Sequence, residues 1–505
     1  MSRSFRTLAS TSALALGLAL LAPPTPVHAS NTWDAIGLPI TGSTGSESGT
    51  SVATSSDGSI VAVGSPEILL GSPGRVEVYQ LTAGTWTQLG ADILGATNGD
   101  WTGFSVALSS DGLTVAVGAP RADPAAKSNA GVVRVYRLQS GTWVQLGADL
   151  AGTAASEYVG SAVSVSASGN RLAIGATGAA FKGAVAVHDY TSGTNSWAQV
   201  GSSLVAEAML DEFGTSVALS DDGVWLAVGA PKNDVGGAAS NAGHARVYEL
   251  VTTAWTQRGA DIDGEVAGDL SGQSLALSAN GQRLVMGSHT SDVNAANAGR
   301  ARVFDYSSSA WSPVGAALNG AAGGDNFGWA VDITAAGDQI AVGARTSDVP
   351  ASDAGSVTAF TLVSGTWTQR GQAVTGTAAS DQAGYALAMS ASGDRIVMGS
   401  PGRAVPSANT GEIQIFGFTE ASVTASEASP GRPGIYLQIA GPVGRPVLDS
   451  PIYVGSDRVA KSSNYSLLLR RVGGRFVTLA EGLVDAGGNA EMRITLPALA
   501  PGDYM

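Results

Sequence analysis

Residues 104–120 read FSVALSSDGLTVAVGAP, and close relatives of this stretch recur along the chain. The Asp111-Gly112 pair separates two apolar runs, which predicts two antiparallel strands joined by a tight hairpin turn. Seven copies follow one another at spacings of 54 to 58 residues when they are aligned on the glycine that opens each copy. A period of this length is typical of a repeat architecture. The opening glycines are Gly49, Gly103, Gly160, Gly214, Gly272, Gly328 and Gly384.

Each unit continues in the same order after its hairpin. A variable loop leads to a third strand such as GVVRVYRL (131–138), and a Trp-bearing strand such as GTWVQLGADL (141–150) ends the unit. Four short strands joined by Gly-rich turns are typical of a β-propeller blade. The first two strands are apolar on both faces, which predicts that they lie between neighbouring blades. The Trp-bearing strand is of mixed composition and suits a half-exposed edge.

The tryptophan strands predict how the ring closes. The seventh unit ends at Phe418 without such a strand, whereas Trp33 precedes the first opening glycine. We therefore expect an all-β fold: a seven-bladed β-propeller of four-stranded blades over residues 31–420, closed by the N-terminal strand. Closure would remove an unpaired strand edge, which otherwise invites aggregation.

The two ends of the chain differ from the repeats. Arg3 and Arg6 precede an apolar run at residues 13–22, and small residues follow at 27–29, so residues 1–29 are expected to be a secretory signal peptide. A membrane anchor is the alternative, but the run is shorter than the ~20 residues that a span needs. Residues 421–434 have linker composition, and residues 435–505 hold short apolar runs that predict a partial Ig-like β-sandwich. The sandwich stops where another strand is expected, which indicates a piece of a longer protein.

The net charge of the chain limits the classes of partner that it is expected to bind. Without Arg3 and Arg6 there are 25 basic and 41 acidic residues, a formal charge of −16. Such a chain disfavours nucleic acid and anionic lipid as partners. There is no cysteine and no later apolar segment long enough to span a membrane, so no disulfide and no transmembrane segment are expected. We expect a secreted or cell-surface protein, and the sequence leaves its oligomeric state open.

The fourth unit carries a family resemblance. The stretch DEFGTSVALSDDGVWLAVGAP (211–231), followed by GHARVYEL (243–250), resembles the FG-GAP repeat of integrin alpha-subunit propellers and their microbial relatives. Phe-Gly recurs at 327–328 and Gly-Ala-Pro at 118–120, and the register extends over all seven units. The resemblance implies a propeller whose variable loops on one face bind proteins or glycans, often in adhesion.

The same family often carries a calcium loop of the type Asp-x-Asx-x-Asp-Gly-x-x-Asp in the first hairpin. The turns here are three to five residues shorter and hold at most two acids, whereas calcium needs 6 to 8 oxygen ligands. The family's calcium sites therefore do not carry over, and no cofactor or metal is expected.

The loops between the second and third strands vary most from unit to unit. They should gather on the same face as the turns between blades, and variable loops on a rigid scaffold are where binding usually lies. Surface loops that vary without function are the alternative. The ligand-binding residues predicted on this face are Arg121, Asp123, Lys232, Asp234, Asp292, Arg345 and Asp348.

An acidic residue also stands three positions before the opening glycine in six units. These carboxylates could form a cation- or ligand-binding ring, but repetition in nearly every blade favours a structural role, in which they accept hydrogen bonds from backbone N–H groups of the turn. The six residues are Asp100, Glu157, Asp211, Asp269, Asp325 and Asp381.

Four further residues stand out. Phe104, Trp329 and Tyr385 follow opening glycines and could stack on a sugar, but their strand parity matches that of the large packing residues, which predicts core positions. Asp332 occupies a place where other blades have Ala or Ser, apparently between blades, and a buried carboxylate there would need a partner.

Catalytic motifs are missing from the sequence. His188, His244 and His289 lie in different units without metal-ligand spacing, and no nucleophile or phosphate-loop motif is present. We expect a non-enzymatic binding propeller with an extracellular protein or glycan as partner. The alternatives are a secreted polysaccharide hydrolase or lyase, which would need two carboxylates converging at the axis, and a structural component of the cell surface.

Overall fold

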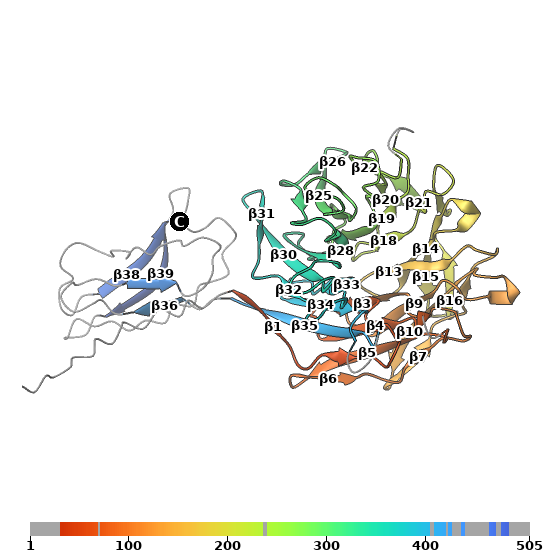
Figure 1. Ribbon diagram of the computed structural model, residues 1–505, viewed down its shortest axis with the longest axis horizontal. Helices are drawn as coiled ribbons and strands as arrows, with labels where there is room; N and C mark the ends of the chain where they lie inside the picture. Colours follow the sequence, from red (N-terminus) through yellow and green to blue (C-terminus); the bar gives the residue numbers. More distant parts are fainter. Residues whose placement is uncertain are drawn as a thin grey trace, which may run out of the picture.

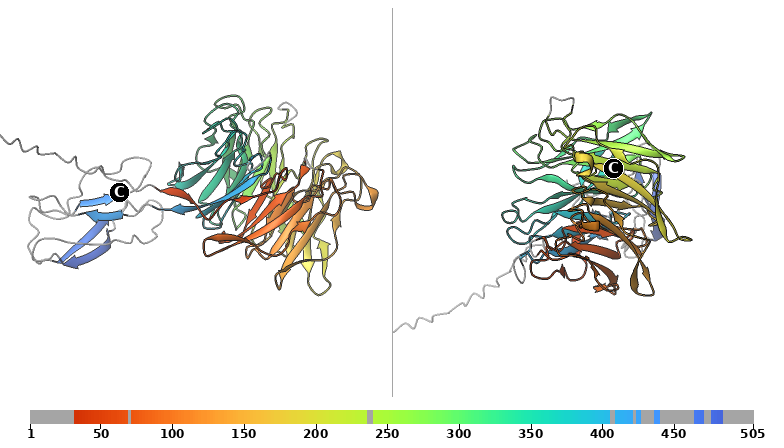
Figure 2. Two further views of the ribbon diagram at one scale, coloured as in Figure 1. Left: turned by 60° about the horizontal axis from the view of Figure 1, so that its bottom comes forward. Right: turned by 90° about the vertical axis from the view of Figure 1, so that its right-hand side faces the viewer.

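The computed structural model describes residues 31–68, 71–235, 240–404 and 409–420 in full, together with the backbone of four strands between residues 423 and 483. Residues 31–420 form seven antiparallel sheets arranged around one axis (Figure 1). Seen from the side, the strands run between two faces that carry the connecting loops (Figure 2). The predicted seven-bladed propeller of four-stranded blades is confirmed. The predicted signal peptide, residues 1–29, lies outside the described residues.

The innermost strand of each blade lies at the axis and has four residues, except in blades 3 and 6, where it has seven. In chain order, from blade 1 to blade 7, these strands are β3 (Ser51–Thr54), β8 (Ser105–Leu108), β13 (Val159–Val165), β18 (Ser216–Leu219), β23 (Ser274–Leu277), β28 (Phe327–Ile333) and β33 (Ala386–Met389).

The second strand of each blade is the most buried. In β9, for example, all six residues are buried, as a strand that is apolar on both faces requires. The second strands are β4 (Ile60–Ser65), β9 (Thr114–Ala119), β14 (Arg171–Ala176), β19 (Trp225–Ala230), β24 (Arg283–Ser288), β29 (Gln339–Ala344) and β34 (Arg395–Ser400).

The third strand is the longest and pairs with an outer strand that is broken into two pieces. The third strands are β5 (Arg75–Thr82), β10 (Val132–Gln139), β15 (Ala184–Thr191), β20 (His244–Val251), β25 (Arg300–Ser307), β30 (Ser356–Val363) and β35 (Glu412–Thr419). The outer pieces of blades 1 to 6 are β6 (Thr85–Gln88) and β7 (Ile93–Leu94), β11 (Thr142–Gln145) and β12 (Leu150–Ala151), β16 (Ser196–Gln199) and β17 (Leu204–Val205), β21 (Ala254–Gln257) and β22 (Ile262–Asp263), β26 (Ala310–Pro313) and β27 (Leu318–Asn319), and β31 (Thr366–Gln369) and β32 (Val374–Thr375).

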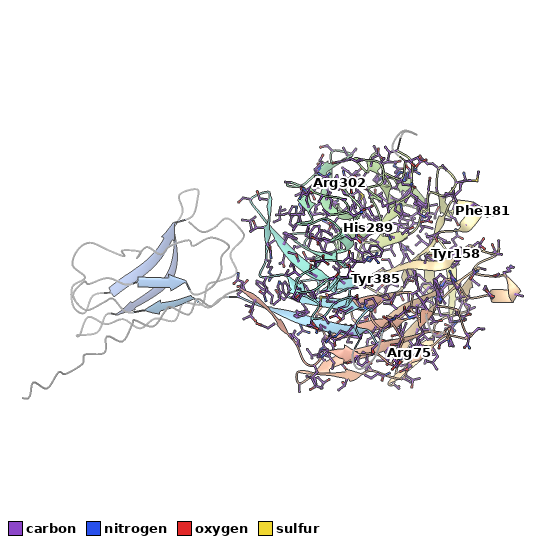
Figure 3. All side chains as sticks on the ribbon, viewed as in Figure 1. Arg75, Tyr158, Phe181, His289, Arg302 and Tyr385 are labelled. Atoms are coloured by element: carbon purple, nitrogen blue, oxygen red, sulfur yellow. The ribbon has the colours of Figure 1, made fainter. Side chains whose placement is uncertain are left out.

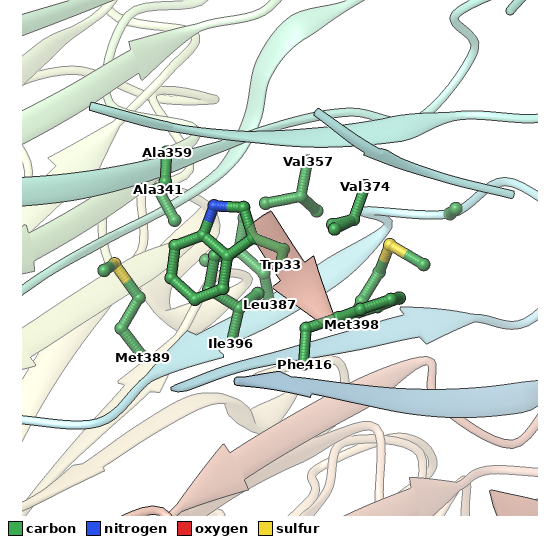
Figure 4. Packing of buried hydrophobic residues seen from close by; sticks show 11 residues of the cluster. Trp33, Ala341, Val357, Ala359, Val374, Leu387, Met389, Ile396, Met398 and Phe416 are labelled. Atoms are coloured by element: carbon green, nitrogen blue, oxygen red, sulfur yellow. The ribbon is translucent and has the colours of Figure 1, made fainter. Parts of the chain in front are cut away.

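The N-terminal strands β1 (Thr32–Ala35) and β2 (Ile40–Thr41) pair antiparallel with β35 of blade 7, with Trp33 opposite Phe418. The Trp33 side chain is buried between blades 6 and 7, where it packs with Val357, Ala359 and Phe416 (Figure 4). The N-terminal segment and the last repeat thus share one core cluster, although they lie at opposite ends of the propeller sequence.

A pair of glycines explains why each unit begins and ends its hairpin with Gly. At the junction of blades 2 and 3, a Cβ on Gly118 would lie 2.3 Å from the backbone oxygen of Gly160, so neither a larger residue nor a shifted strand fits there. Gly160 itself has φ +91°, a conformation that L side chains rarely adopt. The same contact recurs around the ring and includes Gly399 against Gly49.

The hairpin turns form a closed ring of backbone hydrogen bonds. The N–H of Ser56 donates to the oxygen of Ser110 at 2.9 Å, Ser110 to Ala167 at 3.0 Å, and so on through every blade. Ala391 donates back to Ser56 at 2.8 Å, which completes the circle. Within its own turn, Asp111 accepts hydrogen bonds from the Leu113 N–H and the Ser109 hydroxyl, as a tight Asx turn does.

Two short 3-10 helices lie in the variable loops of blades 2 and 3, namely η2 (Pro124–Ala126) and η3 (Ala179–Phe181). Beyond the propeller, β36 (Val423–Ser426) pairs with β37 (Tyr436–Ile439), and β38 (Asn464–Arg470) pairs with β39 (Phe476–Leu483). Strand β36 lies within residues 421–434, for which the composition predicts a linker.

Candidate functional site

The loops between second and third strands lie on the same face as the turns that open the next blade. The loop of blade 2 accepts backbone hydrogen bonds from the opening turn of blade 3: the N–H of Ser156 donates to Ser128, and that of Tyr158 to Asn129. We call this face the loop face. The hairpin turns lie at the opposite ends of the same strands, so their ring of hydrogen bonds belongs to the other face.

The repeated carboxylates before the opening glycines are structural. In each of the six blades that has one, a carboxylate oxygen accepts a backbone N–H from three or four residues earlier, at 2.6 to 3.1 Å. Blade 1 has Ser46 at this place, and its hydroxyl donates to Thr410 O instead. Burial raises the pKa of Asp100 and of Asp325, although the backbone N–H groups favour the charged form. These carboxylates hold the opening turns in shape.

Four of the predicted ligand-binding residues also serve their own loops. Asp123, Asp234, Asp292 and Asp348 are exposed, and one oxygen of each accepts a backbone N–H from five to seven residues later in the loop, at 2.6 to 2.9 Å. The donor residue has a positive φ of 51° to 53° in each case. These bonds fix each loop as a compact turn, and one carboxylate oxygen of each side chain is already in use.

The three predicted basic residues lie in two different environments. The backbone N–H groups of Arg121 and Lys232 donate to the backbone oxygens of Asp100 and Asp211, respectively. In blade 6 the equivalent backbone hydrogen bond is made by Thr346. Arg345 therefore lies one position earlier than its predicted counterparts. Lys232 forms a 2.7 Å ion pair with Glu212, and both side chains are exposed. No hydrogen bond or ion pair joins any two of the seven predicted side chains within the described residues.

Arg345 lies in a cluster of aromatic side chains from three blades. Its guanidinium carbon lies 3.4 Å from the ring centroid of Trp329 and 5.6 Å from that of Tyr385. The Trp329 and Tyr385 rings are 5.5 Å apart, and His289 meets Trp329 edge-on at 4.7 Å. His289 and Tyr385 both lie toward the centre of the ring (Figure 3). We call these four residues the axial cluster.

The electrostatics of the axial cluster are unusual for so acidic a chain. Arg345 is half-buried, its Nε has no hydrogen-bond partner, and it forms no ion pair with a described carboxylate. Burial lowers the pKa of Arg345. Burial and the nearby Arg345 charge lower the pKa of His289 to about 4, so this imidazole is neutral at pH 7. Burial raises the pKa of Tyr385, which keeps its hydroxyl protonated. Arg345 therefore supplies the charge of this cluster.

Blade 2 carries a smaller version of the same arrangement. The Arg121 guanidinium lies 3.8 Å from the Trp101 ring centroid, and Trp101 stacks on Phe104 with centroids 5.8 Å apart. Arg121 is exposed, in contrast to Arg345. Arginine over an aromatic face is a favourable contact in itself, so this pair also has a purely structural explanation.

The prediction that Phe104, Trp329 and Tyr385 belong to the core is wrong. All three are half-buried, and none of them joins a buried core cluster among the described residues. Strand parity fails because Phe104 and Tyr385 precede the paired residues of β8 and β33, while the pairing of β28 is interrupted between Phe327 and Val331. One feature of the sequence does indicate this cluster. Four blades have Pro directly after the second strand, whereas blades 5 and 6 have His289 and Arg345 at that position.

A cavity of about 310 Å³ lies on the axis and is lined by all seven innermost strands. Asp332 is the one titratable side chain among its described lining residues. Its two oxygens accept the N–H of Ile333 at 2.8 Å and of Met389, in the next blade, at 2.7 Å. Burial raises the pKa of Asp332 to about 6. The predicted position between blades is confirmed, and the partners are backbone groups.

A cluster on blade 4 has the composition of a metal site. Ligand atoms of Glu207, His244 and Asp261 lie within 4.8 Å of one another. However, the Arg246 guanidinium forms a 2.8 Å ion pair with Asp261 and a second with Glu207. Because this cation already neutralises both carboxylates, the cluster is better explained as an ion-pair network than as a divalent-cation site.

In the part of the chain that the structure describes, no helix has the length and apolar character needed to cross a bilayer. The fold and the axial cluster together define a propeller with a candidate binding site on its loop face.

A comparison of the sequence with models of known protein families gives one match. The FG-GAP repeat model matches residues 207–248, which include β18 and β19 of blade 4. This match and the seven blades fit an FG-GAP-type propeller, as the sequence resemblance implies. No curated protein sequence matches the chain significantly.

Several solved structures resemble the chain at low similarity. A candidate 6-phosphogluconolactonase from Bacteroides uniformis has 13% identity and a TM-score of 0.46, over 65% of this chain and 85% of its own. The structure of U3-55K has 14% identity and a TM-score of 0.45, over 73% and 94%. The periplasmic gluconolactonase PpgL of Pseudomonas aeruginosa has 16% identity and a TM-score of 0.42, over 72% and 91%. Similarities at this level carry no functional argument.

Proposed function

We propose that this chain is an exported, non-enzymatic binding propeller that holds an extracellular protein or glycan at the axial cluster of its loop face. The single observation that carries the proposal is the Arg345 guanidinium, stacked on Trp329 at 3.4 Å without a carboxylate partner. Most other half-buried arginines of the propeller pair with an acid, as Arg171 does with Asp189 and Arg134 with Asp149. Burying a cation without a counter-ion is costly, and an anionic ligand would supply that counter-ion.

The proposal of a non-enzymatic role rests on the acidic residues that line the axial cavity. A hydrolase or lyase of this shape would use two acidic groups acting in concert, as paired carboxylates do in glycoside hydrolysis. Among the described lining residues of the axial cavity, Asp332 is the single carboxylate, and both of its oxygens accept backbone N–H groups. This arrangement supports a binding role over catalysis.

The finer features of the architecture belong to the same proposal. We infer that β1 closes the ring, because the indole of Trp33 bonds to blade 6 while its backbone pairs with β35 of blade 7. Residues 435–505 are proposed to be a partial Ig-like domain that acts as a spacer, and residues 1–29 a cleaved export signal. Localisation is then extracellular or at the cell surface.

Ligand retention tests the binding site. The full chain would be screened against immobilised extracellular proteins and polysaccharides, and any ligand it retains would be tested again with Arg345→Met. We expect retention to be lost without a change in the thermal midpoint, because Met keeps the apolar stem but removes the charge. The matched control is Arg121→Met combined with Lys232→Met, which should retain the ligand. Undiminished retention by Arg345→Met would contradict the assignment of the site.

A further inference from the structure

The side chains near the axis on the loop face indicate which class of ligand would bind there. This inference rests on the proposed binding function. Seven residues directly follow the opening glycines and lie at the loop-face ends of the innermost strands, which line the axial cavity. All seven are half-buried. We call them the axial ring: Thr50, Phe104, Ser161, Thr215, Gln273, Trp329 and Tyr385.

The composition of the axial ring is that of a carbohydrate-binding surface. Three members are aromatic, three carry aliphatic hydroxyls and one carries an amide, and none is charged. The hydroxyls of Thr50, Ser161 and Thr215 donate to a backbone oxygen three residues earlier, at 2.7 to 2.8 Å. The oxygens of Thr50 and Thr215 are thereby held in fixed positions as acceptors, and that of Ser161 already contacts the Thr177 hydroxyl at 3.1 Å. Aromatic faces beside fixed polar atoms suit a sugar, which offers apolar C–H faces and hydroxyl donors together.

Arg345 adds one positive charge to this neutral ring. Its guanidinium carbon lies 3.4 Å from the Trp329 ring centroid, and this contact restricts its position. A planar, pre-positioned guanidinium matches the two oxygens of a carboxylate. The Lys232 charge is paired with Glu212 at 2.7 Å, whereas no ion pair joins Arg345 to a described carboxylate, so Arg345 is available to an anion.

His289 provides a second group without a partner. Its side chain is 6% exposed, and its Nδ1 has no hydrogen-bond partner. The neutral imidazole beside Arg345 can donate one N–H and does not add a competing charge. A buried ring nitrogen without a partner is unusual, and a ligand oxygen at the cluster would satisfy it.

We propose that the axial cluster binds the carboxylate of a uronic-acid residue in an acidic polysaccharide, with the sugar ring placed over the aromatic members of the axial ring. The neutral hydroxyl-bearing ring favours a sugar over an acidic peptide. The planar guanidinium favours a carboxylate over a neutral sugar.

Affinity electrophoresis of the full chain tests this inference. The gels would contain polygalacturonate, its fully methyl-esterified form, dextran sulfate or polyglutamate. We expect retardation by polygalacturonate and at least about tenfold weaker retardation by the ester, because a charge-assisted hydrogen bond is lost.

Arg345→Met should weaken polygalacturonate binding about tenfold or more, and Trp329→Phe should weaken it less. Arg137→Met, which removes a cation that contacts Tyr190 at the hairpin end of β10, is the matched control and should leave the binding unchanged. Unchanged thermal midpoints would show that the variants fold.

The other outcomes each overturn the inference. Equal retardation by polyglutamate would indicate an acidic-peptide site, and equal retardation by dextran sulfate would indicate unspecific anion binding. Binding of a neutral glycan or a protein that depends on Arg345, without binding of uronate, would leave the proposed function standing and reject the uronate. Arg345→Met variants that bind every ligand as the wild type does would reject both.

Discussion

The indole Nε1–H of Trp33 donates a 2.8 Å hydrogen bond to the backbone oxygen of Arg370, 337 residues later in the chain. The other six tryptophans of the outer strands make the same bond to the preceding blade, among them Trp143 to Leu89 O at 2.7 Å and Trp86 to Ile36 O at 2.8 Å. Each tryptophan thus fastens its blade to its neighbour. At Trp33 the bond joins the N-terminal strand to blade 6.

Replacing Trp33 should therefore be costly. Trp33→Phe removes the hydrogen bond and should lower the free energy of unfolding by about 1 kcal/mol. Trp33→Ala should cost about 3–5 kcal/mol, because the indole is 4% exposed and packs between two blades. Urea unfolding measures both. Trp143 is the matched control: it makes the same bond but is half-buried. A Trp143→Ala variant as unstable as Trp33→Ala would contradict this ranking.

Asp332 should give the propeller a pH-dependent stability. Its pKa is about 6 in the folded chain and 3.8 ordinarily, because burial penalises the charged form. Folding therefore favours the protonated carboxyl. This contribution is complete below pH 4 and is lost as the pH rises through 6, at a cost of at most about 3 kcal/mol. Asp332→Asn should remove this part of the pH profile, measured as the free energy of unfolding between pH 4 and 7.

Ser164 offers a control for the Asp332 experiment. It occupies the same place in blade 3, where its hydroxyl oxygen accepts the N–H of Leu219 at 3.0 Å. Ser164→Ala should lower stability by about 1 kcal/mol at every pH, because no titratable group is changed. If the Asp332→Asn variant retained the full pH dependence of the wild type, the titrating group would lie elsewhere.

The turn-holding carboxylates should differ in importance according to their partners. Asp381 accepts the N–H groups of Thr377 and Ala378 and forms a 3.0 Å ion pair with Arg403. Asp269 accepts the N–H of Val266, at 3.1 Å. We expect Asp269→Ala to lower the free energy of unfolding by about 1–3 kcal/mol and Asp381→Ala to lower it further, since the second variant loses two backbone N–H bonds and the nearer of the two ion-pair partners of Arg403. Thermal and urea unfolding of both variants check the order, and a reversed order would contradict this explanation.

The fold was predictable because its determinants are periodic. A glycine such as Gly118 recurs where two backbones meet, and a glycine such as Gly112 lies in the hairpin turn of every blade, so one sequence contains seven copies of the same pattern. The candidate site breaks that periodicity. The sequence predicts Arg345 as one of several loop cations, but its stacking on Trp329 depends on a one-residue offset and on contacts between blades. The alternation of residues along a strand predicts core positions for Trp329 and Tyr385. This prediction fails because the alternation does not show at which residue the strand begins to pair with its neighbour.

The ring of hairpin hydrogen bonds should appear in hydrogen exchange. The Ser110 N–H lies in a surface turn but bonds to Ala167 of the next blade, and the bonds close on themselves through Ala391 and Ser56. Opening one of them requires neighbouring blades to separate, so we expect these turn amides to exchange as slowly as amides of the buried strand β9. The Lys127 N–H is the control, because it bonds to Pro124 within an exposed loop and can open locally. Exchange of Ser110 as fast as that of Lys127, followed by mass spectrometry, would show that the blades separate independently at this face.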